Sequence, residues 1–154
     1  MKTTLEQITA AGHDADEAPK ITALCEYLEC APDELELARY DHYGLAQYSY
    51  AGRDYAIGTD AECDEAAQKN IADSAWAFNA SFLASFCDLP EEVFTALSEK
   101  CESGNDPIVR LIEKSGGMEK FAQEAISADG RGHFLSSYDG EENEQGEFFI
   151  YRVN

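Results

Sequence analysis

Between residues 45 and 58 the chain runs LAQYSYAGRDYAIG, in which two aromatic-rich segments flank the pair Ala51-Gly52. Aromatic residues such as Tyr48 and Tyr55 are enriched in β-strands, and a small residue followed by glycine suits the tight turn between two strands. The pattern predicts a β-hairpin over about residues 43–58.

A second pair of strands is predicted further along the chain. Residues 133–138 and 148–153 show the two-residue alternation typical of strands, and the acidic segment 139–146 joins them. We expect a hairpin over about 133–153 that completes, with the first, an antiparallel sheet of about four strands.

Helical periodicity fills the segment between the two hairpins. Thr59 and Glu62 have the spacing of a capping box, which predicts a long helix to about Ala75. Further helices are predicted to start at Asn79, Pro90 and Asp106 and after Gly117, the last ending near Gly130.

Two helices are also predicted before the first hairpin. Thr4 and Gln7 form a capping box, and Pro19 suits a first helical position. The second helix places one face toward the core, with Ile21, Leu24, Cys25 and Leu28 at helical spacing. The sequence therefore predicts an α+β fold, in which an antiparallel sheet packs against a helical middle segment and the helices lie on one face.

The length of 154 residues fits one domain. We expect a single α+β domain over residues 1–154, with the helices of residues 1–31 as a candidate small appendage. No repeat or flexible linker divides the chain, and residues 1–77 and 78–154 carry similar net charges of −11 and −9.

Charge is the most unusual property of the sequence. It has 31 Asp+Glu against 11 Lys+Arg, a formal net charge of −20. That sign disfavours direct binding to nucleic acid and to anionic membranes. No apolar run has the length of a membrane span or signal peptide, and the five cysteines include no Cys-x-x-Cys pair, so we expect a cytoplasmic protein with reduced thiols.

The charge suggests mimicry of nucleic acid, in which carboxylates occupy the nucleic-acid-binding groove of a basic protein. Spread evenly over about 7,700 Å² of surface, the net charge would be several times sparser than the roughly one per 100 Å² of duplex DNA, so mimicry requires clustering. Helix capping and solvated loops are the alternative explanation for each cluster. Three candidate partner-binding clusters stand out: Asp33, Glu34, Glu36; Asp60, Glu62, Asp64, Glu65; and Glu141, Glu142, Glu144, Glu147.

Catalytic and metal-binding patterns are weak by comparison. The neighbours Asp41 and His42 point to opposite faces of an extended segment, and no cysteine has the electropositive surroundings of a nucleophile. We therefore expect no catalytic residues, no metal and no cofactor. Arg131 and His133, in the glycine-flanked segment 129–133, suit either a helix-to-strand turn in which Arg131 offsets nearby carboxylates or an anion-binding site.

Two segments, Ser127–Glu142 and Trp76–Leu83, resemble small acidic proteins of unassigned function encoded by tailed phages and prophages. The resemblance covers the second half of the chain and carries over no functional residues. It implies action in the cytoplasm of a bacterial host, and in composition the chain is similar to phage DNA-mimic inhibitors of restriction enzymes and CRISPR complexes.

We expect a non-enzymatic binding protein that inhibits a basic nucleic-acid-binding host protein or defence complex, with mimicry of nucleic acid as the candidate mechanism. The alternative is a self-associating phage structural or assembly accessory whose acidity keeps it soluble. An enzyme that uses Arg131, His133 and carboxylates is a third hypothesis.

Overall fold

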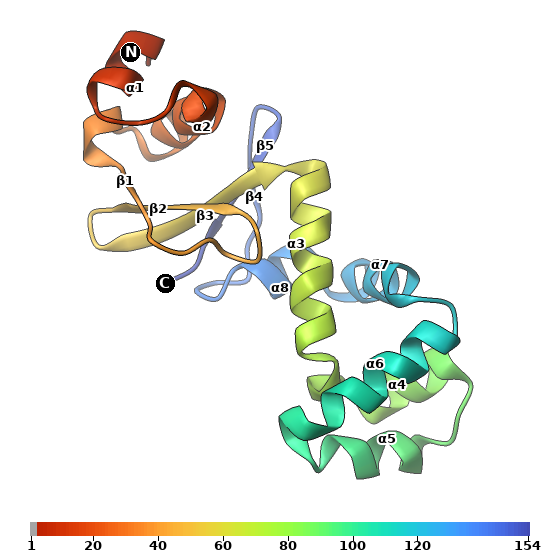
Figure 1. The fold of residues 1–154 in the computed structure, drawn as a ribbon. Coiled ribbons are helices and arrows are strands. Elements are labelled where there is room, and N and C mark those ends of the chain that lie inside the picture. The colour runs from red at the N-terminus through yellow and green to blue at the C-terminus, as the bar shows by residue number, and fades with distance from the viewer. Residues whose placement is uncertain (1–2) are drawn as a thin grey trace. The chain divides into compact units, whose positions relative to one another are not determined.

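A computed structural model describes residues 3–154 and has eight α-helices and a five-stranded antiparallel sheet in that range (Figure 1). The α+β class and the antiparallel sheet are confirmed. The chain divides into two compact units: a sheet unit, Met1–Ala66 with Arg131–Asn154, and a helical unit, Ala67–Gly130.

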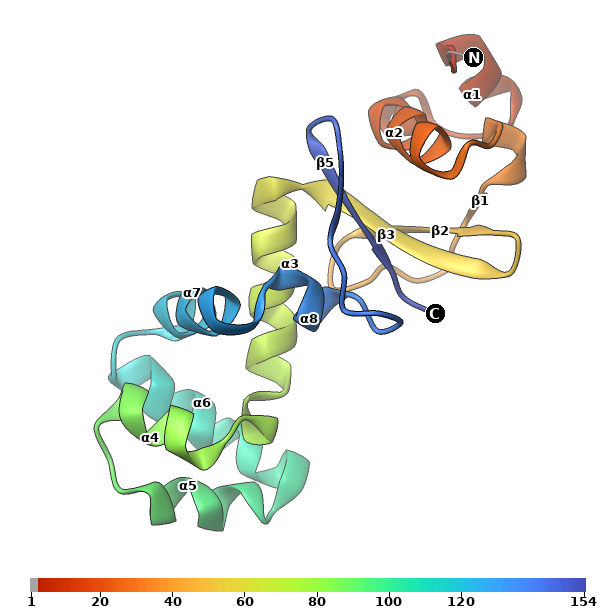
Figure 2. The same ribbon diagram turned by 180° about the vertical axis from the view of Figure 1, so that it is seen from behind.

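The sheet unit contains the strands and the helices next to them in sequence (Figure 2). Its strands are β1 (Glu36–Leu37), β2 (Ala46–Tyr50), β3 (Arg53–Thr59), β4 (Asn143–Gln145) and β5 (Phe148–Arg152). Its helices are α1 (Leu5–Ala10), α2 (Ala18–Leu28), α8 (Arg131–Leu135) and the first turns of α3 (Asp60–Asp73).

The first hairpin is confirmed. Strands β2 and β3 pair antiparallel up to Tyr50 and Arg53, so Ala51 and Gly52 form a two-residue turn. Their φ angles of 51° and 76° are both left-handed, as a turn that matches the twist of the strands requires.

The second hairpin differs from its prediction. Residues 143–145 pair with 148–150, and the expected strand at 133–138 is wrong because residues 131–135 form the short helix α8. Gly132 and Leu135 are both buried, and their separation of three residues is a helical spacing. In the sequence, the alternation of polar residues in this segment indicates a strand instead. Backbone pairing along β5 turns part of the acidic loop into strand β4, so the sheet order is β1-β2-β3-β5-β4.

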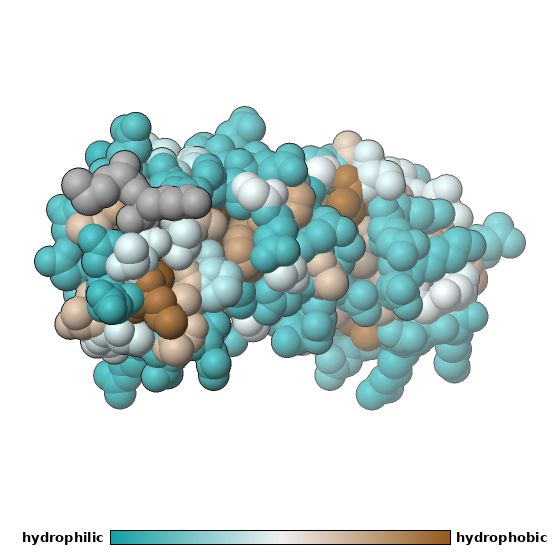
Figure 3. All heavy atoms as spheres, turned by 90° about the horizontal axis from the view of Figure 1, so that it is seen from above, coloured by the Kyte–Doolittle hydropathy of each residue, from teal (hydrophilic) through white to brown (hydrophobic). Residues whose placement is uncertain are grey.

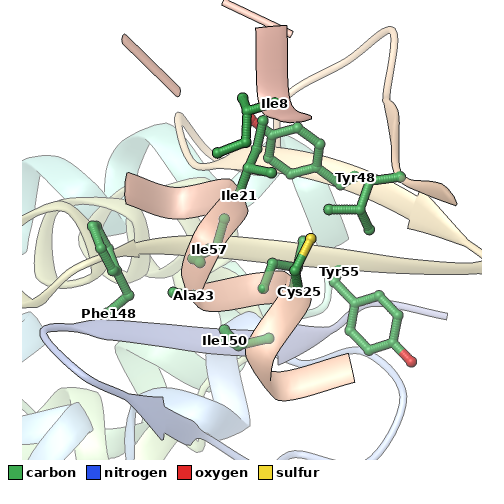
Figure 4. Close-up of a cluster of buried hydrophobic side chains, with 11 residues drawn as sticks. Ile8, Ile21, Ala23, Cys25, Tyr48, Tyr55, Ile57, Phe148 and Ile150 are labelled. Carbon is green, nitrogen blue, oxygen red and sulfur yellow. The ribbon is translucent and has the colours of Figure 1, made fainter. Parts of the chain in front are cut away.

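One face of the sheet is covered by α1 and α2. Figure 4 shows Ile21 and Cys25 of α2 above Ile57 and Ile150 of the two central strands. The expected capping box is present, since Thr4 Oγ1 accepts the Gln7 N–H. The helix starting near Pro19 is confirmed as α2.

The opposite face is covered as well, so the expectation of helices on one face is wrong. Ala56 and Tyr151 are cross-strand neighbours on that face and both are fully buried. A Cβ on Gly58 would lie 2.5 Å from Leu45 Cδ2 and 3.3 Å from Cys63 Sγ, so the first turn of α3 packs closely against this glycine. The Thr59–Glu62 capping box that starts α3 is confirmed by reciprocal hydrogen bonds.

The helical unit confirms the predicted helix starts to within one residue. It packs Phe82 and Phe86 edge-on against Phe121, with ring centroids 5.4 and 5.1 Å apart. Asn105 holds the end of α3, because its side chain accepts the Trp76 N–H and donates to the Ala72 carbonyl. Its helices are α4 (Ala80–Cys87), α5 (Glu91–Ser98), α6 (Asn105–Lys114) and α7 (Met118–Asp129), with short 3₁₀ turns at Ala75–Ala77 and Cys101–Gly104. The sheet unit has two further 3₁₀ turns, at Ala15–Glu17 and Pro32–Glu34.

Candidate functional site

Arg131, the first residue of α8, is the centre of an ion-pair network within the sheet unit. Its Nη1 lies 2.8 Å from Asp60 Oδ1 and 3.0 Å from Asp64 Oδ1, and its Nε lies 2.7 Å from Glu142 Oε1. The guanidinium also donates to the Asp60 carbonyl and lies 4.6 Å from the centroid of the Phe149 ring. The Arg131 side chain is only 8% exposed, so its charge is committed to groups of the chain itself.

The network continues inward through Glu142. Burial and the hydrogen bond that Tyr151 donates to Glu142 raise the pKa of the Tyr151 hydroxyl. Burial lowers the pKa of Arg131, but its hydrogen bonds to Glu142 and Asp60 outweigh that effect and raise the pKa overall. Next to Tyr151, burial raises the pKa of the Cys63 thiol to about 11, which leaves the thiol protonated at neutral pH.

This network explains the second acidic cluster. Asp60 and Asp64 pair with Arg131, and Glu62 pairs with Lys20 at 3.1 Å. The hydrogen bond from the Thr59 N–H holds the pKa of Glu62 below its usual range, and the contact with Lys20 lowers it by a smaller amount. Three members of the cluster thus stabilise the start of α3, and Glu65 is exposed.

The first cluster lies at one edge of the sheet. Asp33 and Glu34 belong to the 3₁₀ turn before β1, and Glu36 stands on β1 itself; all three are exposed. Glu34 accepts the Ala31 N–H at 2.8 Å and so also caps its turn.

The third cluster lies at the opposite edge. Glu144 is on β4, and Glu141 and Glu147 flank that strand; these three side chains are exposed. The side chain of Glu142, 31% exposed, pairs with Arg131. Four strand spacings of about 4.8 Å separate the two edge strands, so their backbones are about 19 Å apart across the sheet. The structure therefore does not bring the three clusters together.

Net charge is unequal between the two units. The sheet unit has 20 Asp+Glu and 6 Lys+Arg, a net charge of −14, and the helical unit has 11 and 5, a net charge of −6. The similar values for the two sequence halves conceal this difference because the sheet unit is assembled from separate segments. The face in Figure 3 is largely hydrophilic, with apolar residues in small separate areas.

The histidines lie apart. His133 is exposed on α8 with its ring edge-on to Phe134, and it does not join the Arg131 network. The His42 Nε2 lies 2.8 Å from the Leu135 carbonyl; burial lowers the pKa of His42 more than this hydrogen bond raises it. His13 Nε2 lies 2.9 Å from the Pro32 carbonyl, so each of these two rings holds a loop in place.

A hollow of about 390 Å³ beside β1 was missed by the sequence analysis. The exposed apolar side chains Leu37 (58% exposed) and Tyr40 (72%) line it, with Arg39 Cζ 5.6 Å from the Tyr40 ring centroid. Its other lining residues are Glu36, Ala38, Gln47, Ser49 and Asp54. The signal in the sequence is the segment ELELARYDHY at 34–43, where apolar and aromatic residues alternate with charges outside a helical period.

Within residues 3–154, no group of three or more His, Cys, Asp or Glu side chains is arranged to hold a metal ion. In the same range, none of the helices combines the length and apolarity needed to cross a membrane. No family model, curated protein or solved structure matches this chain.

Proposed function

We propose that the protein binds a basic, nucleic-acid-binding protein or complex and inhibits it by competing with nucleic acid. The observation that supports this most directly is the net charge of −14 on the sheet unit, together with exposed carboxylates on both edge strands. Such a field speeds encounter with a cationic surface and repels nucleic acid itself. In the phage setting that the sequence resemblance implies, the target is a defence complex of the bacterial host.

Charge density favours the sheet unit over the whole molecule as the binding part. A net charge of −20 over 8746 Å² is about one charge per 440 Å², well below duplex DNA at roughly one per 100 Å². The sheet unit carries 14 of the 20 net charges on 90 of the 154 residues, so its share of the charge exceeds its share of the chain. Burial of Arg131 under Asp60, Asp64 and Glu142 also ties α3 and α8 to the strands, which supports a rigid presentation of charge.

The test is affinity capture from a bacterial lysate at low and high salt, followed by competition with duplex DNA. We expect one stoichiometric nucleic-acid-binding protein that DNA releases, with retention that weakens as ionic strength rises. A triple variant, Glu36→Gln, Glu144→Gln and Glu147→Gln, removes charge from both edges and is expected to weaken this binding about tenfold.

The matched control changes exposed glutamates of the helical unit, Glu92→Gln, Glu113→Gln and Glu119→Gln. It alters net charge by the same amount and is expected to bind like the wild type. Equal weakening by both triple variants would show that only total charge matters. Recovery of the protein with copies of itself alone would overturn the proposal and favour an assembly role.

A further inference from the structure

Strand β1 has an unpaired outer edge in the part of the chain that the structure describes. Leu37 is opposite Tyr48, and the next residue, Ala38, donates its N–H to the Gln47 carbonyl at 2.9 Å. Successive residues of a strand direct their backbone groups to opposite sides, so the N–H and C=O of Leu37 point away from β2.

The side chains beside this edge divide by chemistry between the two faces of the sheet. Leu37 shares a face with its cross-strand neighbour Tyr48. Glu36 shares the other face with Ser49 and Asp54, because these residues are directly opposite one another in β1, β2 and β3. An approaching chain therefore meets an apolar contact on one face and the exposed carboxylate of Glu36 on the other. Asp54 lies two strands further in, where its carboxylate accepts hydrogen bonds from Ser49 and Asn154.

We propose that an extended, basic segment of the partner adds as a further strand along β1. This inference rests on the proposed function and names the partner's contact. The residue opposite Leu37 exchanges backbone hydrogen bonds with it and places an apolar side chain beside Leu37. The residues before and after it fall on the face of Glu36, where lysine or arginine complements the charge of that exposed carboxylate and the net negative charge of the sheet unit.

The register thus specifies a basic-apolar-basic sequence in the partner segment. Tyr40 supplies further contact area at the hollow, and aromatic side chains contribute strongly to binding at protein interfaces. The short length of β1 limits strand pairing to about three residues. Charge and side-chain contacts therefore supply the rest of the affinity.

The test uses a capped nine-residue peptide of alternating lysine and valine, with binding followed by fluorescence anisotropy. Two further peptides carry N-methyl groups on the valines alone or on the lysines alone. Strand addition requires the valine N–H groups at the edge, so N-methyl-valine is expected to weaken binding about tenfold and N-methyl-lysine less than about threefold. Equal affinities for the two methylated peptides would overturn the inference.

Variants of the protein test the same contact from the other side. Leu37→Pro removes an N–H that points away from β2, so β1 keeps its ladder and peptide binding is expected to fall about tenfold. Leu37→Ala keeps that N–H and is expected to lose less. A proline variant that binds like the alanine variant would contradict strand addition.

The peptide results and the lysate capture separate the two proposals. DNA-released capture of a nucleic-acid-binding protein, combined with no binding of the unmodified peptide, would overturn the edge inference alone. Failure of both experiments would overturn the proposed function as well.

Discussion

Arg131 shows how a single side chain joins segments that are distant in sequence. Its carboxylate partners come from α3 and from the loop before β4, more than 65 residues away in one case and 11 in the other. The sequence analysis placed Arg131 among neighbouring carboxylates as one of two alternatives. Which carboxylates pair with Arg131 could not be predicted from the sequence, because the direction of the guanidinium depends on helix α8, where a strand was expected.

We expect Arg131→Ala to lower the free energy of unfolding by about 2–3 kcal/mol, since it leaves Glu142 and two further carboxylates without their cation. The exposure of Asp60 and Asp64 keeps the loss below that of a fully buried pair. Urea unfolding followed by circular dichroism measures the change. Arg131→Lys keeps the charge but not the forked geometry and is expected to lose about half as much; an alanine variant within about 0.5 kcal/mol of the wild type would contradict the structural role.

His42 makes the stability of the sheet unit decrease as the pH becomes acidic. Burial lowers its pKa in the folded protein below the value in the unfolded chain, so folding favours the neutral ring. The stabilisation is present above the unfolded pKa and is lost as pH falls through the folded pKa. We expect the urea midpoint to fall between pH 7 and pH 5 more steeply for the wild type than for His42→Gln, and parallel profiles would argue against this contribution.

At the scale of elements, local rules predicted correctly wherever a residue pattern had one low-energy solution. Capping boxes at Thr4 and Thr59 fixed two helix starts, and Ala51-Gly52 fixed a hairpin. The prediction of a strand at 133–138 was wrong because a five-residue helix is too short for its hydrophobic period to be distinguished from the alternation of a strand. The polar strand β4 has no propensity signal and exists because β5 offers it a pairing edge.

The first hairpin turn allows a stabilising substitution. Ala51 has a φ of 51°, a conformation that costs alanine about 1 kcal/mol and that asparagine tolerates better. We expect Ala51→Asn to raise the free energy of unfolding by about 0.5–1 kcal/mol in urea titrations. The control, Ala128→Asn on the exposed side of α7, is expected to destabilise slightly because asparagine is the poorer helix former; a gain of the same size there would remove the conformational explanation.

At the scale of the whole molecule, net charge is divided unequally between the two structural units, although it is divided almost equally between the two halves of the sequence. The sheet unit is formed from two separated segments and carries −14 of the net charge of −20. Net charge was evident from composition, but its distribution required knowledge of which segments associate. Prediction of the hollow at β1 required knowledge of the sheet order, because only an edge strand leaves backbone groups unpaired.

Self-repulsion rises roughly with the square of net charge, so salt should stabilise the sheet unit more than the helical unit. All eight tyrosines lie in the sheet unit and the single tryptophan, Trp76, lies in the helical unit, which gives each unit its own spectroscopic probe. We follow thermal unfolding by the near-ultraviolet signals of tyrosine and of tryptophan. Between 20 mM and 500 mM NaCl, we expect the melting temperature reported by tyrosine to increase at least about twice as much as that reported by tryptophan. Identical shifts would show that the charge difference has no local effect on stability.

Pairing of Ile57 with Ile150 has a consequence for synthesis on the ribosome. A nascent chain that has emerged through residue 130 contains the complete helical unit, yet its strand β3 lacks the neighbour that will occupy one side. An unpaired central strand is a template for association with other chains, so the interval before β5 emerges is when aggregation competes most strongly with folding. Ribosomes that stall within residues 131–147 would therefore release chains more prone to aggregate than those that stall before residue 45, where neither β2 nor β3 has formed.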